Sequence, residues 1–218
     1  MLGVTYKTAW FMTHRIREAM KDMGGGPLGG EGKTVEADET YFGNVKGSRT
    51  KKTFINGKGW VNRGGGQNKY KIVALVERGG RARSVKVDSI TANQVRDVLV
   101  TNVDRKSKLM TDESNVYIKV GTEFTIHGTV NHSDYEWARG PYHTNTIEGF
   151  FSIFKRGMIG VYQHCSEKHL HRYLAEFDFR YSHRVRLGWT DKMRVDRIME
   201  GIEGKRLTYR RPHEASHA

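Results

Sequence analysis

The order of strand-like and helix-like segments between residues 34 and 184 is the strongest constraint on the fold. Strands alternate inward and outward residues with a period of two, whereas amphipathic helices repeat buried residues every three to four positions. These periods predict strands at 34–43, 69–77, 81–90, 107–114 and 123–130, and helices at 91–103, 143–157 and 166–184. Three strands, a helix, two strands and two helices predict an α/β fold with a mixed five-stranded sheet flanked by helices, rather than a doubly wound sheet.

The segments outside this core predict the domain organisation. Residues 4–21 predict an amphipathic helix whose buried side carries Ala9, Met12, Ile16 and Ala19 or Met20, with Lys7, His14, Arg15 and Arg17 on the polar side. The glycine-rich stretch that follows predicts a flexible linker. We therefore divide the chain into an N-terminal helix (1–23), a linker (24–33), a main domain (34–185) and a basic C-terminal extension (186–218).

The charge of the chain indicates an anionic partner. Lys and Arg number 37 against 24 Asp and Glu, a formal net charge of +13. Nucleic acid is the polyanion that such a balance most often serves. A membrane surface is disfavoured, because no segment combines a basic face with a broad apolar one. No membrane-length apolar run or signal peptide is visible, which predicts a cytoplasmic protein. The single cysteine, Cys165, excludes an internal disulfide and a cysteine-based zinc cluster within this chain.

The stretch from Gly43 to Val76 contains eight basic residues and no acid. Its glycine-rich first part, 43–69, predicts a long basic loop or hairpin inserted into the main domain. Such a loop is often simply solvated, but the absence of acids favours contacts with a nucleic-acid backbone. The residues assigned to these contacts are Lys46, Arg49, Lys51, Lys52 and Arg63.

Three acids on separate predicted elements suit metal-dependent phosphodiester chemistry. Asp38 lies within a strand, where alternation places Glu36 and Thr40 on the same face. Asp112 ends a strand, and Glu148 lies in the first turn of a helix. Two divalent ions about 4 Å apart, held by a few carboxylates, can activate a nucleophile and stabilise a leaving oxygen. These acids are the candidate catalytic and metal-binding residues.

Each candidate also has a simpler interpretation. Asp38 could be a surface carboxylate on an edge strand, and Asp112 could cap the turn after its strand. Glu148 and Asn145 form a near capping box, with Asn145 as the N-cap. The other acids close to these candidates are assigned structural roles: Glu36, Glu39 and Glu113.

Four stretches give the chain a family resemblance. They read "VEADETYFG", "LMTDES", "HTNTIEGFFSIFKRGMIGVYQHCSEKHLHRYLAEFDFRYSHR" and "GIEGKRLTYR". In these stretches the chain resembles the DDE transposases of prokaryotic insertion sequences, in the ISXO-like group. The resemblance implies a ribonuclease-H-like catalytic domain in which Asp38, Asp112 and Glu148 hold two Mg²⁺ ions, with Mn²⁺ as a substitute. Some members of the group use asparagine at the third position, which makes Asn145 the alternative to Glu148.

The same resemblance implies further roles and partners. Lys155, one to two turns after Glu148, would contact DNA together with Arg156, whereas without the resemblance Lys155 reads as a solvated helical lysine. His143 is a candidate for contact with the scissile phosphate. The implied function is cleavage and transfer of DNA strands by a nucleoid-associated homo-oligomer that binds double-stranded transposon ends and target DNA.

Relatives begin with a zinc ribbon and a helix-turn-helix, of which residues 1–23 resemble only the last helix. Two other functions stay open from the sequence. One is a ribonuclease-H-like nuclease without joining activity. The other is a catalytically idle DNA-binding remnant of a truncated element.

Overall fold

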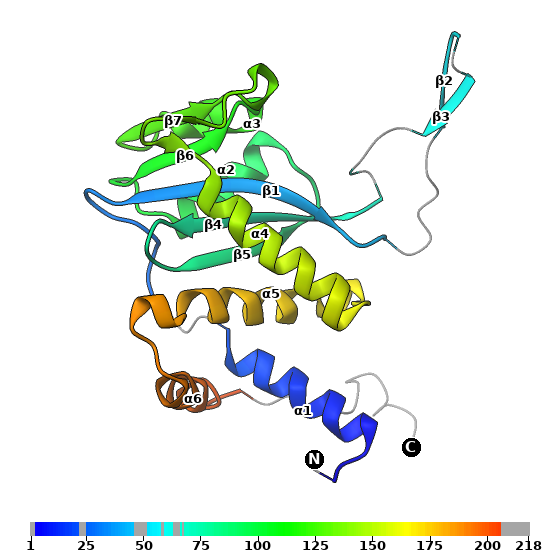
Figure 1. Cartoon of the computed structure of the whole chain (residues 1–218), viewed down its shortest axis with the longest axis vertical. Coiled ribbons are helices and arrows are strands. Elements are labelled where there is room, and N and C mark those ends of the chain that lie inside the picture. The colour runs from blue at the N-terminus through cyan, green and yellow to red at the C-terminus, as the bar shows by residue number, and fades with distance from the viewer. Residues whose placement is uncertain are drawn as a thin grey trace.

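A five-stranded sheet forms the centre of the molecule (Figure 1). The computed structural model describes residues 3–21, 25–45, 52–57, 59–62, 66 and 68–205. The strands of the sheet are β1 (Thr34–Phe42), β4 (Tyr70–Glu77), β5 (Ala82–Val87), β6 (Lys108–Asp112) and β7 (Ile126–Val130). Their spatial order is β5-β4-β1-β6-β7, with β1 antiparallel to β4 and parallel to β6. This arrangement confirms the predicted mixed sheet and is that of a ribonuclease-H-like domain.

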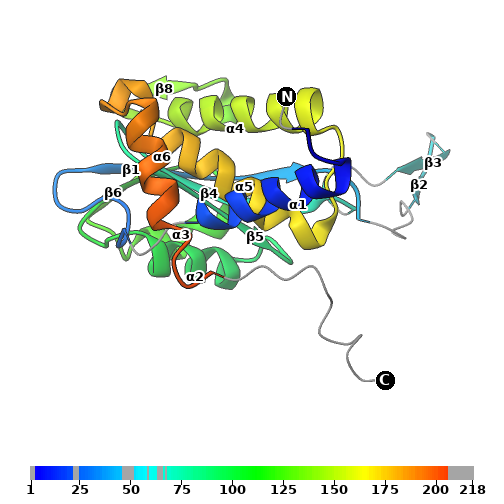
Figure 2. The ribbon, with the colours of Figure 1, turned by 90° about the horizontal axis from the view of Figure 1, so that it is seen from below.

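Helices cover both faces of the sheet. On one face lie α2 (Ala92–Asn102) and α3 (Asn115–Gly121), and on the other α4 (Asn145–Gly157) and α5 (Glu167–Ser182). Thr91 caps α2, since its hydroxyl accepts a hydrogen bond from the Gln94 amide. Beyond α5 lie α1 (Tyr6–Ala19) and α6 (Asp191–Glu200), both of them outside the sheet layers (Figures 1 and 2). Of these helices, α3 and α6 were not predicted.

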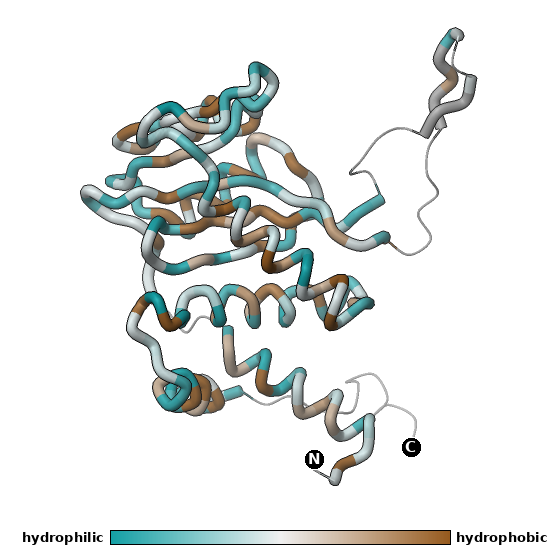
Figure 3. Tube along the Cα trace, viewed as in Figure 1, coloured by the Kyte–Doolittle hydropathy of each residue, from teal (hydrophilic) through white to brown (hydrophobic). Residues whose placement is uncertain are grey.

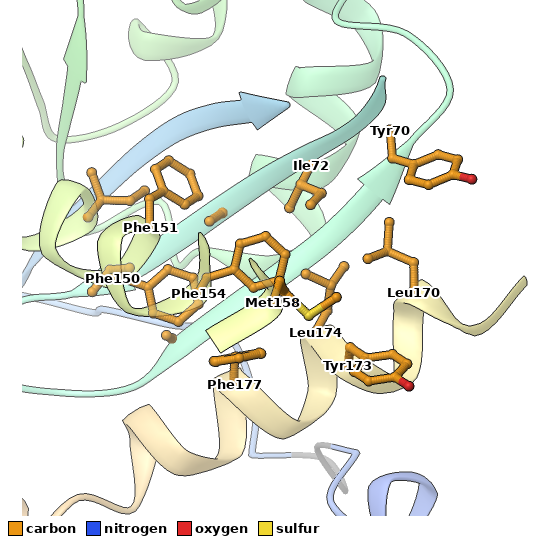
Figure 4. Close-up of a cluster of buried hydrophobic side chains, with 14 of the residues drawn as sticks. Tyr70, Ile72, Phe150, Phe151, Phe154, Met158, Leu170, Tyr173, Leu174 and Phe177 are labelled. Carbon is orange, nitrogen blue, oxygen red and sulfur yellow. The ribbon is translucent and has the colours of Figure 1, made fainter. Parts of the chain in front are cut away.

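Two hydrophobic clusters hold the layers together. Ile72, Ala74 and Val76 of β4 face α4 and α5, where they join the aromatic cluster drawn in Figure 4. Val73 and Leu75 of the same strand face the opposite way, toward α2 and α3. Because β4 is covered on both faces, it is a nearly continuous apolar run (Figure 3). On α4 the buried residues are Ile147, Phe150, Phe151 and Phe154.

The N-terminal helix buries Ala19 as predicted, but otherwise packs mainly with the side that was predicted to be polar. Met12 and Ile16 are 39% and 44% exposed, whereas His14 and Arg17 are buried. The reason is a buried ion pair with α5, in which Arg17 Nε lies 2.7 Å from Glu176 Oε2. The Arg17 guanidinium also lies over the ring of Tyr173. Periodicity identifies the two faces of a helix, but a charged partner on α5 decided which face is covered.

Short elements connect the main ones. They are β2 (Lys52–Ile55), β3 (Gly59–Asn62), η1 (His132–Asp134), β8 (Ala138–Arg139), β9 (Tyr142–His143), the π-helical η2 (Met158–Tyr162) and η3 (Val185–Leu187). Strands β2 and β3 form a hairpin that stands away from the sheet (Figure 1), in agreement with the hairpin form of the predicted basic insertion. Four predicted DNA contacts (Lys46, Arg49, Lys51, Arg63) and the Lys52 side chain lie outside the described residues.

Part of the predicted linker is packed. Leu28 is buried and its backbone bonds with Asn102 and Asp104, beside Val103. The domain boundaries stay predictions. No helix among the described residues is long and apolar enough to span a membrane.

Candidate active site

Asp38 and Asp112 lie at the same level on neighbouring strands. The parallel ladder of β1 and β6 runs from Thr34 opposite Lys108 to Glu36 opposite Met110. The same register, continued by two residues beyond the last pair, sets Asp38 level with Asp112, and the charge of Asp112 acts on Asp38. Asp38 is directly opposite Ala74, which belongs to the cluster under α4 and α5. Both aspartates therefore point to the face of the sheet that α4 covers.

Glu148 comes to this face from the first turn of α4. Its side chain is 45% exposed and accepts a 3.0 Å hydrogen bond from the Thr144 hydroxyl. The helix begins one residue earlier than the capping-box interpretation requires: Thr144 is the N-cap, and its hydroxyl accepts no hydrogen bond from the amides of the first turn. Asn145 is the first helical residue and is exposed. The capping interpretation of Asn145 and Glu148 is therefore wrong.

The acids repel one another in a partly buried setting. The pKa of Asp38 is raised from 3.8 to about 8, mostly by burial and in addition by the charges of Glu39, Asp112 and Glu148. Burial also raises the pKa of Asp112, against the opposing effects of the Ser114 amide and His132. The charges of Asp112 and Glu148 thus both act on Asp38.

The three neighbouring acids make structural contacts, as predicted. Glu36 is fully buried; its Oε1 lies 2.6 Å from Arg78 Nε, and its Oε2 accepts a hydrogen bond from the Ile147 amide. The hydrogen bond from the Ile147 amide connects the start of α4 to Glu36 of β1. Glu39 accepts a hydrogen bond from the Tyr117 hydroxyl on the other face of the sheet. Glu113 accepts hydrogen bonds from the segment after β7, and these bonds lower its pKa to about 2.

His132 is a residue of this site that the sequence reasoning missed. Its Nε2 lies 3.3 Å from the Thr144 hydroxyl and 3.7 Å from Glu148 Oε1. The signal that could have found it is its position just after β7, since Asp112 pairs with Val130 two residues before it. The carboxyl ends of neighbouring parallel strands lie at one edge of the sheet, so residues just beyond them meet.

The predicted DNA-contacting residues of α4 are exposed. Lys155 and Arg156 lie about two turns after Glu148, and the helical repeat puts Lys155 nearly in line with it. His143 lies against Glu36 instead, with its Nδ1 3.3 Å from Glu36 Oε1 but outside hydrogen-bond geometry. A contact of His143 with a phosphate stays a prediction.

Comparison with protein families decides what kind of domain this is. The family model described as the ISXO2-like transposase domain matches residues 27–182, which is more than half of the chain. The chain belongs to the ISXO2-like transposases. This transposase is thus a DDE-type protein of insertion sequences, with an implied role in transposition and in DNA binding. No significant match was found among curated proteins or among solved structures.

The comparison bears on metals as well, because DDE transposases typically use divalent ions. Among the described residues of this transposase, no three His, Cys, Asp or Glu side chains already form a group that could hold a metal ion. The carboxylates of Asp38, Asp112 and Glu148 share one face and interact electrostatically, and ion binding would have to complete their arrangement.

Proposed function

We propose that this transposase cleaves DNA strands at the ends of an insertion sequence and transfers them to target DNA. Asp38, Asp112 and Glu148 are its catalytic carboxylates. One observation carries the proposal. The three acids come from β1, β6 and α4, and the charges of Asp112 and Glu148 help to raise the pKa of Asp38 to about 8. Carboxylates whose pKa is strongly perturbed by burial and by neighbouring acids are common at functional sites.

The donor set fits divalent cations. Carboxylate oxygens are the protein ligands that Mg²⁺ prefers, and Mn²⁺ accepts the same ones. The mutual repulsion that raises the pKa of Asp38 is the kind that a bound cation relieves. Two Mg²⁺ ions, held by Asp38, Asp112 and Glu148, would supply activation of the attacking oxygen and stabilisation of the leaving oxygen.

The protein's own side chains provide the framework for this chemistry. The sheet holds Asp38 and Asp112 side by side, and the Glu36–Arg78 pair holds α4 against β1. Glu148 is the most exposed of the three acids, so it faces the side from which a nucleic acid can approach.

Lys155 and Arg156 are exposed further along α4 and would neutralise phosphates of the bound strand without reading its sequence. The basic insertion would add such contacts on double-stranded transposon ends and target. Joining two ends at one target favours a homo-oligomer.

Each chemical step exchanges one phosphodiester P–O bond for another. In cleavage, a water oxygen bonds to phosphorus while the bond to the 3′ oxygen breaks, which leaves a free 3′-hydroxyl. In transfer, that hydroxyl attacks a target phosphate and releases a 3′-hydroxyl of the target strand. Because bonds are exchanged one for one, the reaction needs no energy-rich cofactor.

Replacement of Asp112 by asparagine tests the proposal. With labelled oligonucleotides and Mg²⁺ or Mn²⁺, we expect Asp112→Asn to lose cleavage and joining but to bind DNA as the wild type does. Asp88→Asn is the matched control, because Asp88 is 87% exposed and lies outside the cluster. Undiminished cleavage by Asp112→Asn would remove Asp112 from the mechanism. Cleaved but never joined products from the wild type would instead indicate a nuclease.

The third carboxylate is tested in the same assay. Loss of cleavage in Glu148→Gln with retention in Asn145→Ala supports Glu148, and the reverse result supports Asn145.

A further inference from the structure

We propose that His132 is a positioning residue of the acid cluster, which orients the Glu148 carboxylate through the hydroxyl of Thr144. The inference rests on the proposed function, because it concerns the same three acids. It assigns a role to a histidine that none of the sequence motifs singled out.

The segment that carries His132 is anchored next to Asp112. Glu113, the residue after Asp112, accepts hydrogen bonds from the His132 amide at 3.0 Å and from the Ser133 hydroxyl at 2.7 Å. Asn131 adds a bond from the Ser133 amide to its side-chain oxygen. The backbone of His132 is therefore fixed relative to the strand end that presents Asp112.

From this anchored backbone the imidazole reaches Glu148. Thr144 Oγ1 donates its single hydrogen to Glu148 Oε1, because an ionised carboxylate can only accept. The contact between His132 Nε2 and Thr144 Oγ1, 3.3 Å long, must then run from the imidazole N–H to the hydroxyl oxygen. A directed chain of donors results, from His132 Nε2–H through Thr144 to Glu148. It assigns a hydrogen to Nε2.

A purely stabilising role explains this arrangement poorly. His132 Nδ1 is buried and has no hydrogen-bond partner among the described residues, which costs about 1–3 kcal/mol. The ring packs on Trp137 at a centroid distance of 5.1 Å, but Trp137 is itself 59% exposed, so little apolar burial offsets that cost. A buried ring nitrogen without a partner, kept beside a proposed catalytic carboxylate, favours a positioning role for His132.

Glu148 has particular need of such support. It is a long side chain, and its exposure leaves several rotamers open that aim the carboxylate away from Asp38 and Asp112. Thr144 is buried, so the hydroxyl that it offers is fixed in place. Partners of this kind change metal affinity or activity by about 10–100-fold when they are removed.

Two amide substitutions separate this role from general damage. Glutamine can place its amide nitrogen near the position of Nε2, whereas the shorter asparagine reproduces only Nδ1. We expect His132→Gln to keep cleavage within about threefold of wild type, and His132→Asn to lose about tenfold in kcat with little change in KM for DNA. His164→Ala, at an exposed histidine away from the cluster, is the control.

Binding of Mn²⁺ alone, followed by calorimetry, gives a readout that needs no activity. We expect a weaker Mn²⁺ affinity in His132→Asn, but not in His132→Gln or His164→Ala, with unchanged thermal unfolding temperatures in the absence of metal. Equal Mn²⁺ affinity and kcat in the glutamine and asparagine variants would overturn the role of His132. If the wild type itself neither binds Mn²⁺ nor cleaves DNA, the proposed function fails instead.

Discussion

Replacing Asp38 by asparagine is expected to stabilise the metal-free protein at alkaline pH, although it removes a proposed catalytic ligand. The pKa of Asp38 is raised from 3.8 to about 8, mainly by burial. Between these values the folded state binds more protons than the unfolded state, so the free energy of unfolding falls as pH rises. The favourable contribution of neutral Asp38 is complete below pH 4 and is lost as pH passes through about 8.

The size of the effect follows from the shift. Each pKa unit corresponds to about 1.4 kcal/mol, which gives an upper limit of about 6 kcal/mol for the whole shift. Solvent reaches part of Asp38 and screens its charge, so we expect about 2–3 kcal/mol. Asparagine keeps an oxygen that can accept the hydrogen bond from the Glu39 amide, and its own cost does not depend on pH.

Urea unfolding in EDTA at several pH values between 4 and 9 measures this difference. The stability of Asp38→Asn relative to wild type should increase by about 2–3 kcal/mol across that range. The same comparison for Asp88→Asn should stay flat. Adding Mg²⁺ at pH 9 should stabilise the wild type selectively and narrow the gap, since a ligand that binds only the folded state stabilises it. A gap that does not change with pH would refute the reasoning about the acid cluster.

Three further predictions concern the surroundings of the site. Glu36→Gln breaks the buried pair with Arg78 and should lower the free energy of unfolding by about 3 kcal/mol, measured with urea; a loss under 1 kcal/mol would contradict the anchoring role. Arg17→Met leaves Glu176 with Arg180 and the Tyr162 hydroxyl as partners and should cost about 2 kcal/mol, with faster hydrogen exchange in α1; unchanged exchange would argue against the ion pair between α1 and α5. DNA affinity should fall steeply between low and physiological salt in filter binding, and a flat response would speak against phosphate contacts by the basic insertion.

Much of the fold could be predicted because its signals are local. The strand at 34–43 and the helix at 143–157 differ from β1 and α4 by at most two residues at either end, since alternation and apolar spacing act within a few positions. Helices α3 and α6 were missed for the same reason: α3 is short, and α6 has no buried residue whose spacing could identify it. The covered face of α1 was predicted wrongly, because its partner Glu176 is 159 residues away along the chain.

For the candidate site, the sequence by itself determined which acid lies within a strand, which ends a strand and which lies at the start of a helix. Those positions depend on backbone periods that each segment carries alone. Only the tertiary structure decided that Asp38 and Asp112 lie level on one face and that Glu36 is anchored beneath α4. It also decided that His132 contacts Thr144 and Glu148. The physical reason is that such contacts arise from strand order and register, which pair segments that have no periodic relation in the sequence.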